Sequence, residues 1–277
     1  MKKLLLFICT LLTAMIINAA DNKNWQTITL YTESFPPFQW SENNVTVGPM
    51  FTIMELICKE AKINCKIVML KWKDTIAKAE SGEGEGIFSI VELPERRAKF
   101  YLGNPIVKSG YAAFVLKENK WVYTKPSDLN GLDVAAYGPS GTSIIAKESI
   151  AMASDVEFHM ESSILGSFQN LVEEKYGLKG VVVANADVGN YLIKQHSISG
   201  LRNAGFIKPV SFTFGLSRKN SKSVLILDLN KALQKLQHDG VISKILAKYN
   251  MVAAEEWEED SSTIAISKPK KKVEGKK

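Results

Sequence analysis

Arg96, in the sequence Pro94-Glu95-Arg96, is the side chain with the most specific binding chemistry. Its planar guanidinium can donate two parallel hydrogen bonds to one carboxylate, which a lysine ammonium cannot do. The same side chain could instead form a surface ion pair with Glu92 or Glu95. The sequence around Arg96 therefore indicates either a carboxylate-binding site or an ordinary ion pair.

Thr142 and Ser143 lie where a glycine-containing turn enters a predicted helix. Free backbone N–H groups and the helix dipole at such a position attract an anion, for example a carboxylate. The alternative is that these residues only cap the helix. The spacing around Ser140 does not match the Gly-x-Ser-x-Gly pattern of a nucleophilic serine. We therefore expect anion binding or capping here, and no catalytic residue.

Cys58 and Cys65 are the two cysteines that follow the N-terminal segment. In an oxidising compartment an even pair at short spacing is typical of a disulfide. The histidines are far apart in sequence and none lies near either cysteine. Since this spacing does not fit a metal site, we expect a disulfide and neither a metal nor a cofactor.

The elements that must position these residues alternate in type. The first hundred residues predict strands at 28–31, 66–70 and 86–91 and helices at 50–61 and 74–81. After a strand at 111–116, a second series predicts strands at 133–136, 156–160 and 180–184, separated by helices, before a strand at 211–216 and two closing helices. This alternation is typical of α/β units, each a mostly parallel sheet flanked by helices.

The N-terminus has the layout of a secretory signal peptide. Lys2 and Lys3 precede an apolar run over 4–17, and Ala19 and Ala20 offer a cleavage site. Removing residues 1–20 takes away two lysines and no acid, so the formal charge falls from +6 to +4. We expect cleavage near Ala19/Ala20, export to the periplasm, and no later membrane span.

The two α/β series predict a chain organised in two lobes. We expect a signal peptide at 1–20, lobe 1 at 21–117, lobe 2 at 118–208, a return to lobe 1 at 209–250, and a charged, disordered tail at 251–277. An acidic block in the tail precedes its lysines and would compete with nucleic acid for them, so no nucleic-acid partner is expected. Ligands of such sheets bind beyond the carboxyl ends of the strands, and a cleft between two lobes closes by hinge motion.

Eight short motifs, in order, resemble the family 3 extracellular solute-binding proteins, which include polar amino-acid receptors of bacterial ABC importers. The motifs are Phe35-Pro36-Pro37-Phe38, Gly48, Ser81-Gly82 with Glu85, Pro94-Glu95-Arg96, Asn104-Pro105, Asp128-Leu129-x-Gly131, Ser140-Gly141-Thr142, and Asp239-Gly240 with 245–249. The resemblance covers nearly all of residues 27–250. It implies the two-lobed fold of periplasmic binding proteins (type II), with the ligand cleft between the lobes.

The resemblance assigns roles to seven residues. Arg96 matches the arginine that holds the ligand carboxylate, and Thr142 and Ser143 match the helix terminus that faces it. Phe35 and Trp72 match aromatic residues that pack on the ligand, although either could be simple core. Ser89 matches a hydrogen-bonding position. Asn185 aligns with the acid that receives the ligand ammonium, with Ala184 as the other register; Asp187 or Glu92 could supply the missing charge.

These residues predict a monomeric binding protein that captures a small ligand, an amino acid or an organic acid, for an inner-membrane ABC permease. A polar amino acid is the first expectation. An organic acid without an amino group is the alternative, because Asn185 offers an ammonium only a neutral acceptor. A dehydratase of the cyclohexadienyl type would need an acid such as Glu92, Glu173 or Glu174. A free sensory protein that presents a ligand to a receptor is a third possibility.

Overall fold

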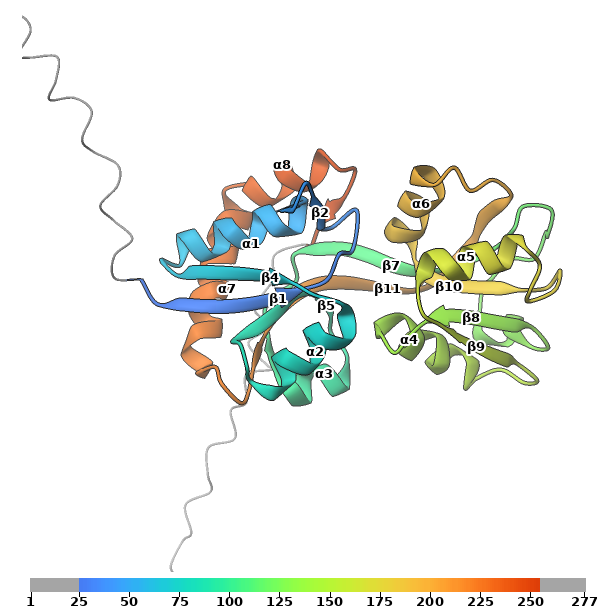
Figure 1. The fold of residues 1–277 in the computed structure, drawn as a ribbon, viewed down its shortest axis with the longest axis horizontal. Coiled ribbons are helices and arrows are strands. Elements are labelled where there is room, and N and C mark those ends of the chain that lie inside the picture. The colour runs from blue at the N-terminus through green and yellow to red at the C-terminus, as the bar shows by residue number, and fades with distance from the viewer. Residues whose placement is uncertain (1–24, 255–277) are drawn as a thin grey trace, which may run out of the picture.

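A computed structural model describes residues 25–254 of the chain, which form two lobes joined by two long strands (Figure 1). The signal peptide expected at residues 1–20 lies outside the described residues, as does the tail from residue 255 onward. In the part that the structure describes, none of the helices has the length and apolar character that a membrane span requires.

Lobe 1 contains the first α/β series and the closing helices. Its elements are β1 (Thr27–Thr32), β2 (Trp40–Glu42), β3 (Val45–Val47), α1 (Pro49–Glu60), β4 (Asn64–Met69), α2 (Trp72–Ser81), β5 (Gly86–Val91), α3 (Pro94–Lys99), β6 (Phe100–Leu102), α7 (Ser223–His238), α8 (Val241–Ala247) and β12 (Val252–Ala253). Strands β4 and β5 both pair with β1 in parallel, as the alternating pattern predicts.

Lobe 2 contains the second series. Its elements are a 3-10 turn at Pro126–Leu129, β8 (Asp133–Tyr137), α4 (Gly141–Ile150), β9 (Glu157–Glu161), α5 (Ile164–Val172), β10 (Val181–Asn185) and α6 (Ala186–Gln195). The strands β10, β8 and β9 are parallel neighbours. Each lobe therefore has the predicted parallel sheet, and helices cover it (Figure 1).

Strands β7 (Val107–Leu116) and β11 (Leu201–Ser217) run through both lobes and pair with each other in antiparallel fashion. At the lobe 1 end β11 pairs with β5, and at the lobe 2 end β7 pairs with β10. The described strands thereby form one sheet in the order β4-β1-β5-β11-β7-β10-β8-β9. The lobe boundaries expected at residues 117 and 208 stay a prediction; the first follows β7 directly and the second lies within β11.

Two expectations from the sequence need correction. The strand expected at 211–216 starts ten residues earlier, because Pro209 does not interrupt it. Only β7 pairs with β11 at Pro209, since β5 joins from Phe212 onward, and a strand edge tolerates the missing N–H. Residues 251–254, which the sequence assigns to a disordered tail, are instead ordered: β12 pairs with β7, and the flanking Met251 and Ala254 are buried.

The disulfide predicted between Cys58 and Cys65 is confirmed. Cys58 lies in the last turns of α1 and Cys65 near the start of β4, with their Cα atoms 6.0 Å apart. The bridge therefore fixes the turn that connects the first helix of lobe 1 to an edge strand of its sheet.

A candidate ligand cleft between the lobes

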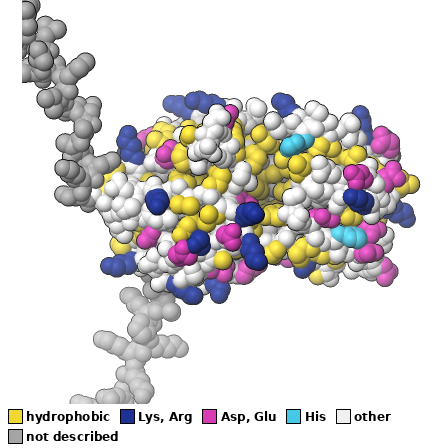
Figure 2. Space-filling view, viewed as in Figure 1, with side chains coloured by type: hydrophobic (Ala, Val, Ile, Leu, Met, Phe, Trp, Pro, Cys, Tyr) yellow, Lys and Arg dark blue, Asp and Glu magenta, His cyan; other side chains and the backbone are white. Residues whose placement is uncertain are grey.

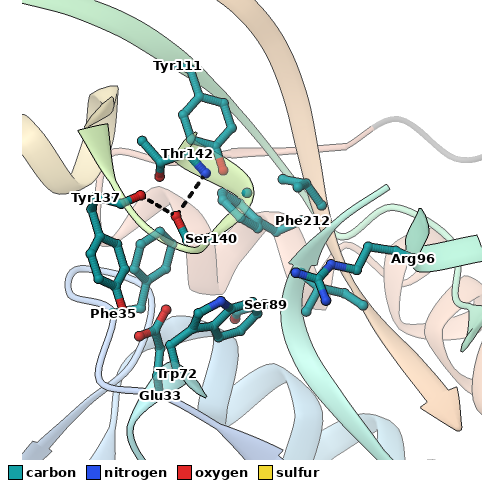
Figure 3. A pocket seen from close by; sticks show the side chains of 13 residues that line it. Glu33, Phe35, Trp72, Ser89, Arg96, Tyr111, Tyr137, Ser140, Thr142 and Phe212 are labelled. Atoms are coloured by element: carbon teal, nitrogen blue, oxygen red, sulfur yellow. Dashed lines mark hydrogen bonds between the residues drawn. The ribbon is translucent and has the colours of Figure 1, made fainter. Parts of the chain in front are cut away.

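A cavity of about 30 Å³ lies between the lobes, at the carboxyl ends of β1, β5 and β8 (Figure 3). Its lining comes from both lobes and from the connecting strands: Glu33, Phe35, Trp72, Ser89, Ile90, Val91, Arg96, Tyr111, Tyr137, Ser140, Gly141, Thr142 and Phe212. A Cβ atom added to Gly141 of lobe 2 would lie 3.2 Å from Val91 Cγ2 of lobe 1. The lobes are thus in contact, and the closed cavity has room for about one water molecule.

Arg96 projects from α3 into this cavity and is 7% exposed. Its guanidinium lies 5.5 Å from the centre of the Trp72 ring, and its Nη1 is 3.4 Å from Glu80 Oε1. The ion pair is with Glu80 and not with either partner suggested by the sequence: Glu92 pairs with Arg97, and Glu95 acts on Arg96 only through its charge. Burial lowers the pKa of Arg96, but an arginine keeps its charge at neutral pH. A buried cation with one distant partner favours an incoming carboxylate.

The N-terminus of α4 faces the cavity from lobe 2. Ser140, rather than Thr142, caps this helix: its Oγ accepts a hydrogen bond from Thr142 N at 3.1 Å. Ser140 N in turn donates to Ser143 Oγ at 3.0 Å, and Ser140 Oγ donates to Tyr137 O at 2.7 Å. Gly141 N–H, at the first helical position, has no acceptor among the described residues. It remains available to an anion at the positive end of the helix dipole.

Ser89 lies within β5 but has a φ of +60°, a conformation that costs energy for any residue except glycine. The pairing of β5 with β11 shifts register beside it. Ser89 Oγ donates to Gln39 Oε1 at 2.7 Å, and Gln39 Nε2 donates to Glu33 O at 3.1 Å and to Thr32 Oγ1 at 3.0 Å. Gln39 is fully buried and positions both Ser89 and the backbone of Glu33, a role that the sequence did not indicate.

Glu33 contributes a carboxylate to the cavity that the sequence analysis missed. It follows β1 directly, and burial raises the pKa of its carboxyl to about 8. Burial, and to a lesser extent the charge of Glu33, raises the pKa of the Tyr137 hydroxyl to about 12. Figure 3 shows Glu33 and Tyr137 at one end of the cavity and Arg96 at the other. One sequence signal could have identified Glu33, namely that it directly follows a predicted parallel strand, at the carboxyl end where ligands bind.

The structure brings five of the seven predicted site residues to the cavity and leaves two outside it. The five are Phe35, Trp72, Ser89, Arg96 and Thr142. Ser143 is buried behind Ser140 in the helix cap.

Asn185 is hydrogen-bonded within the protein through both ends of its amide. Its Oδ1 caps α6 by accepting from Val188 N at 3.1 Å, and its Nδ2 donates to Ser109 Oγ at 2.8 Å and to Gly110 O at 3.2 Å. Asp187 accepts from the same Ser109 hydroxyl, so it also lies in this hinge-side network and not in the cavity lining. Of the described carboxylates, the cavity lining contains only Glu33.

Comparison with known proteins identifies the family from the sequence itself. Residues 28–252 match the model of the bacterial extracellular solute-binding proteins, family 3. None of the curated proteins matches this chain.

Three similar solved structures share the fold at low sequence identity. An ancestral arginine-binding protein bound to arginine is 23% identical, with a TM-score of 0.70 over 80% of this chain and 97% of that one. A histidine kinase sensor domain similar to periplasmic binding proteins is 15% identical, with a TM-score of 0.72 over 83% and 99%. An ancestral amino acid-binding protein, a precursor of cyclohexadienyl dehydratase, is 18% identical, with a TM-score of 0.67 over 80% and 94%.

The family match covers almost all of the described residues, and the two lobes with a cleft between them are the architecture that the sequence motifs predicted. This chain belongs to the family 3 bacterial extracellular solute-binding proteins.

Proposed function

We propose that this protein captures a small carboxylate-bearing solute in the periplasm, in the first instance an amino acid, and delivers it to an inner-membrane ABC permease without chemical change. The observation that supports this most is the presence of Arg96 and the α4 N-terminus around one cavity, on different lobes. Both groups favour an anion, and neither alone can enclose one.

Binding by both lobes explains how capture and closure are coupled. A solute that touches only one lobe makes half of its contacts, so it gains the rest when the lobes close and thereby selects the closed state. The 30 Å³ cavity is smaller than an amino acid, so the lobes must separate for entry and close less tightly around the solute. We expect a monomer, because one chain supplies both walls of the cleft.

A thermal-unfolding screen of the mature protein against amino acids, organic acids and polyamines tests the ligand class. The correct carboxylate solute, at about 100 times its Kd, is expected to stabilise the protein by about 2.7 kcal/mol. Small-angle scattering of the same samples should show a more compact molecule with ligand. If no carboxylate-bearing solute raises the unfolding temperature, the proposed function is wrong. Permease and ATPase genes next to this one would favour transport over sensing.

The pH dependence of binding should reveal whether the solute places a cation against Glu33. In an open cleft water solvates the carboxylate, so its pKa returns toward the ordinary value of 4.5. In the closed structure burial raises this pKa to about 8, so closure around a solute without a cation should raise it in the same direction; binding then takes up a proton and weakens as the pH rises through the neutral range. A solute with an ammonium at Glu33 keeps the carboxylate charged, and its affinity should be nearly constant over this range.

Calorimetry in two buffers of different ionisation enthalpy measures this proton uptake directly. The Glu33→Gln variant should abolish the uptake, whereas Glu42→Gln, a change at an exposed residue of β2, should not. Proton uptake that persists in Glu33→Gln would assign the titrating group elsewhere.

A dehydratase is the second candidate, and Glu33 is the observation that favours it. A carboxyl with a pKa of about 8 is protonated at neutral pH and could act as an acid toward a leaving group. The acids that the sequence suggested are placed elsewhere: Glu92 and Glu173 are exposed and paired with Arg97 and Lys175, and Glu174 is exposed. We expect no turnover of prephenate or arogenate; turnover that is lost in Glu33→Gln would establish the enzyme.

A further inference from the structure

A second, larger cavity of about 230 Å³ adjoins the first one. It is lined by Glu33, Ser34, Phe35, Pro36, Tyr137, Ser162, Ser163, Ile164, Leu165, Val188 and Leu192. Glu33, Phe35 and Tyr137 line both cavities, so these three side chains stand at the junction between them. One solute could therefore extend from the first cavity into the second.

The walls of the second cavity are mainly apolar and come from both lobes. Phe35 and Pro36 line it from lobe 1, and side chains of α5 and α6 line it from lobe 2: Ile164, Leu165, Val188 and Leu192. In Figure 2 hydrophobic side chains gather in the middle of the molecule, between the lobes. The Ser163 hydroxyl is used to cap α5, where it accepts from Gly166 N at 3.0 Å. The surface thus favours an apolar group, with Glu33 as its only charged residue.

Across the two cavities, the groups that could bind a solute follow one another in a fixed order. Arg96, which favours a carboxylate, lies at one end of the first cavity, and the Glu33 carboxyl and Tyr137 hydroxyl lie at its other end, at the junction (Figure 3). The α4 N-terminus, whose Gly141 N–H also favours a carboxylate, lines the same cavity. The second cavity, called the apolar chamber below, lies beyond the junction. An α-amino acid carries its carboxylate, ammonium and side chain on a single carbon, so it can offer one group to each of these three places.

We infer that the solute is an amino acid with a large apolar side chain, which occupies the chamber beyond Glu33 and Tyr137. This inference rests on the proposed function and changes one part of what the family resemblance predicts, namely a polar side chain. The ammonium faces Glu33 because the family's ammonium-binding position is Asn185 here, and its amide is already hydrogen-bonded within the protein.

Calorimetric titration of the wild-type protein with L-leucine, L-phenylalanine, L-alanine and L-arginine tests the chamber. Leucine has three more carbons than alanine, and burying them at about 0.8 kcal/mol each corresponds to a gain in affinity of about 50-fold. Phenylalanine should also bind more tightly than alanine, and arginine should not exceed leucine. The acid 4-methylpentanoate, which has the carbon chain of leucine and no ammonium, should bind more weakly than leucine.

Leu165 offers a variant that changes the chamber without touching the groups that face the carboxylate. Because Leu165 is partly exposed, Leu165→Asn should fold normally and reduce the preference for leucine over alanine about fivefold. The matched control is Leu178→Asn in the same lobe, at a side chain outside both cavities that is 68% exposed, and it should leave the preference unchanged.

The outcomes separate this inference from the proposed function. If alanine or arginine binds at least as tightly as leucine, and binding needs Arg96, the inference is overturned and the proposed function stands. An unchanged preference for leucine in Leu165→Asn also overturns the chamber assignment. If no carboxylate-bearing solute binds in a manner that depends on Arg96, both are overturned.

Discussion

Binding is expected to weaken by about 1.5–3 kcal/mol, or about 10- to 150-fold, when Arg96 is replaced by lysine. Lysine keeps the positive charge but loses the planar pair of donors that fits a carboxylate. It also loses the contact of the guanidinium with the Trp72 ring. Calorimetry with the best ligand from the screen measures the effect. Since the arginine is buried with only a 3.4 Å contact to Glu80, little else is available to compensate.

Arg97 provides the matched control for Arg96. It is the next residue of α3, but its side chain is exposed and pairs with Glu92. Arg97→Lys should leave the affinity within about twofold, because exposed ion pairs contribute little. Thermal unfolding of both variants separates binding from folding. Unchanged affinity in Arg96→Lys would mean that Arg96 has only a structural role, through Trp72 and Glu80.

The sequence predicts the lobes well because their elements are local. Each strand or helix of an α/β unit can be predicted from its own residues, for example from the apolar run of β1 or the β-branched residues of β4. The full length of β11 could not be predicted in this way. Its first half is held by pairing with β7, which is far away in sequence, and Pro209 gives the opposite local signal. Tertiary pairing therefore decides this strand, against its local preference.

The sequence predicts those cleft residues that lie in a recognisable motif. Arg96 and Thr142 lie in short motifs with a physical reason for binding an anion, and both line the cavity. Glu33 lies in no such motif, and its raised pKa is caused by burial between the two lobes, which a sequence does not reveal. Gln39 was missed for a related reason, since its three hydrogen-bond partners come together only in the folded chain.

A cluster of residues of metal-binding type on the outer edge of lobe 2 also could not be predicted from the sequence. The spacing of the histidines along the chain predicts no metal site. In the described part of the protein, the side chains of Asp133, Glu157 and His159 nevertheless come within 4.8 Å of one another. The parallel pairing of β8 with β9 places Asp133 opposite Glu157, and His159 Nε2 lies 3.0 Å from Asp133 Oδ1. Linear spacing cannot reveal a cluster that strand register creates.

Loss of the disulfide is expected to have the largest effect on stability. The bridge between Cys58 and Cys65, seven residues apart, closes a short loop, and the chain-entropy relation gives about 2–3 kcal/mol for a loop of this size. The Cys58→Ala/Cys65→Ala double variant should lose this amount in the free energy of unfolding, measured in urea. Its affinity for the ligand should not change, because neither cysteine lines the cleft.

Chemical reduction provides the control for the side-chain changes themselves. The wild-type protein in dithiothreitol should unfold at nearly the same urea concentration as the double variant, because Cys58, which is 3% exposed, is tolerated as a free thiol in an apolar core. Mass spectrometry of protein prepared from the periplasm should show no free thiol at Cys58 or Cys65. If the double variant and the oxidised wild-type protein unfold together, the bridge does not stabilise lobe 1. The connection between α1 and β4 would then depend on the packing of α1 against the sheet, where Met50, Ile53, Met54 and Ile57 are fully buried.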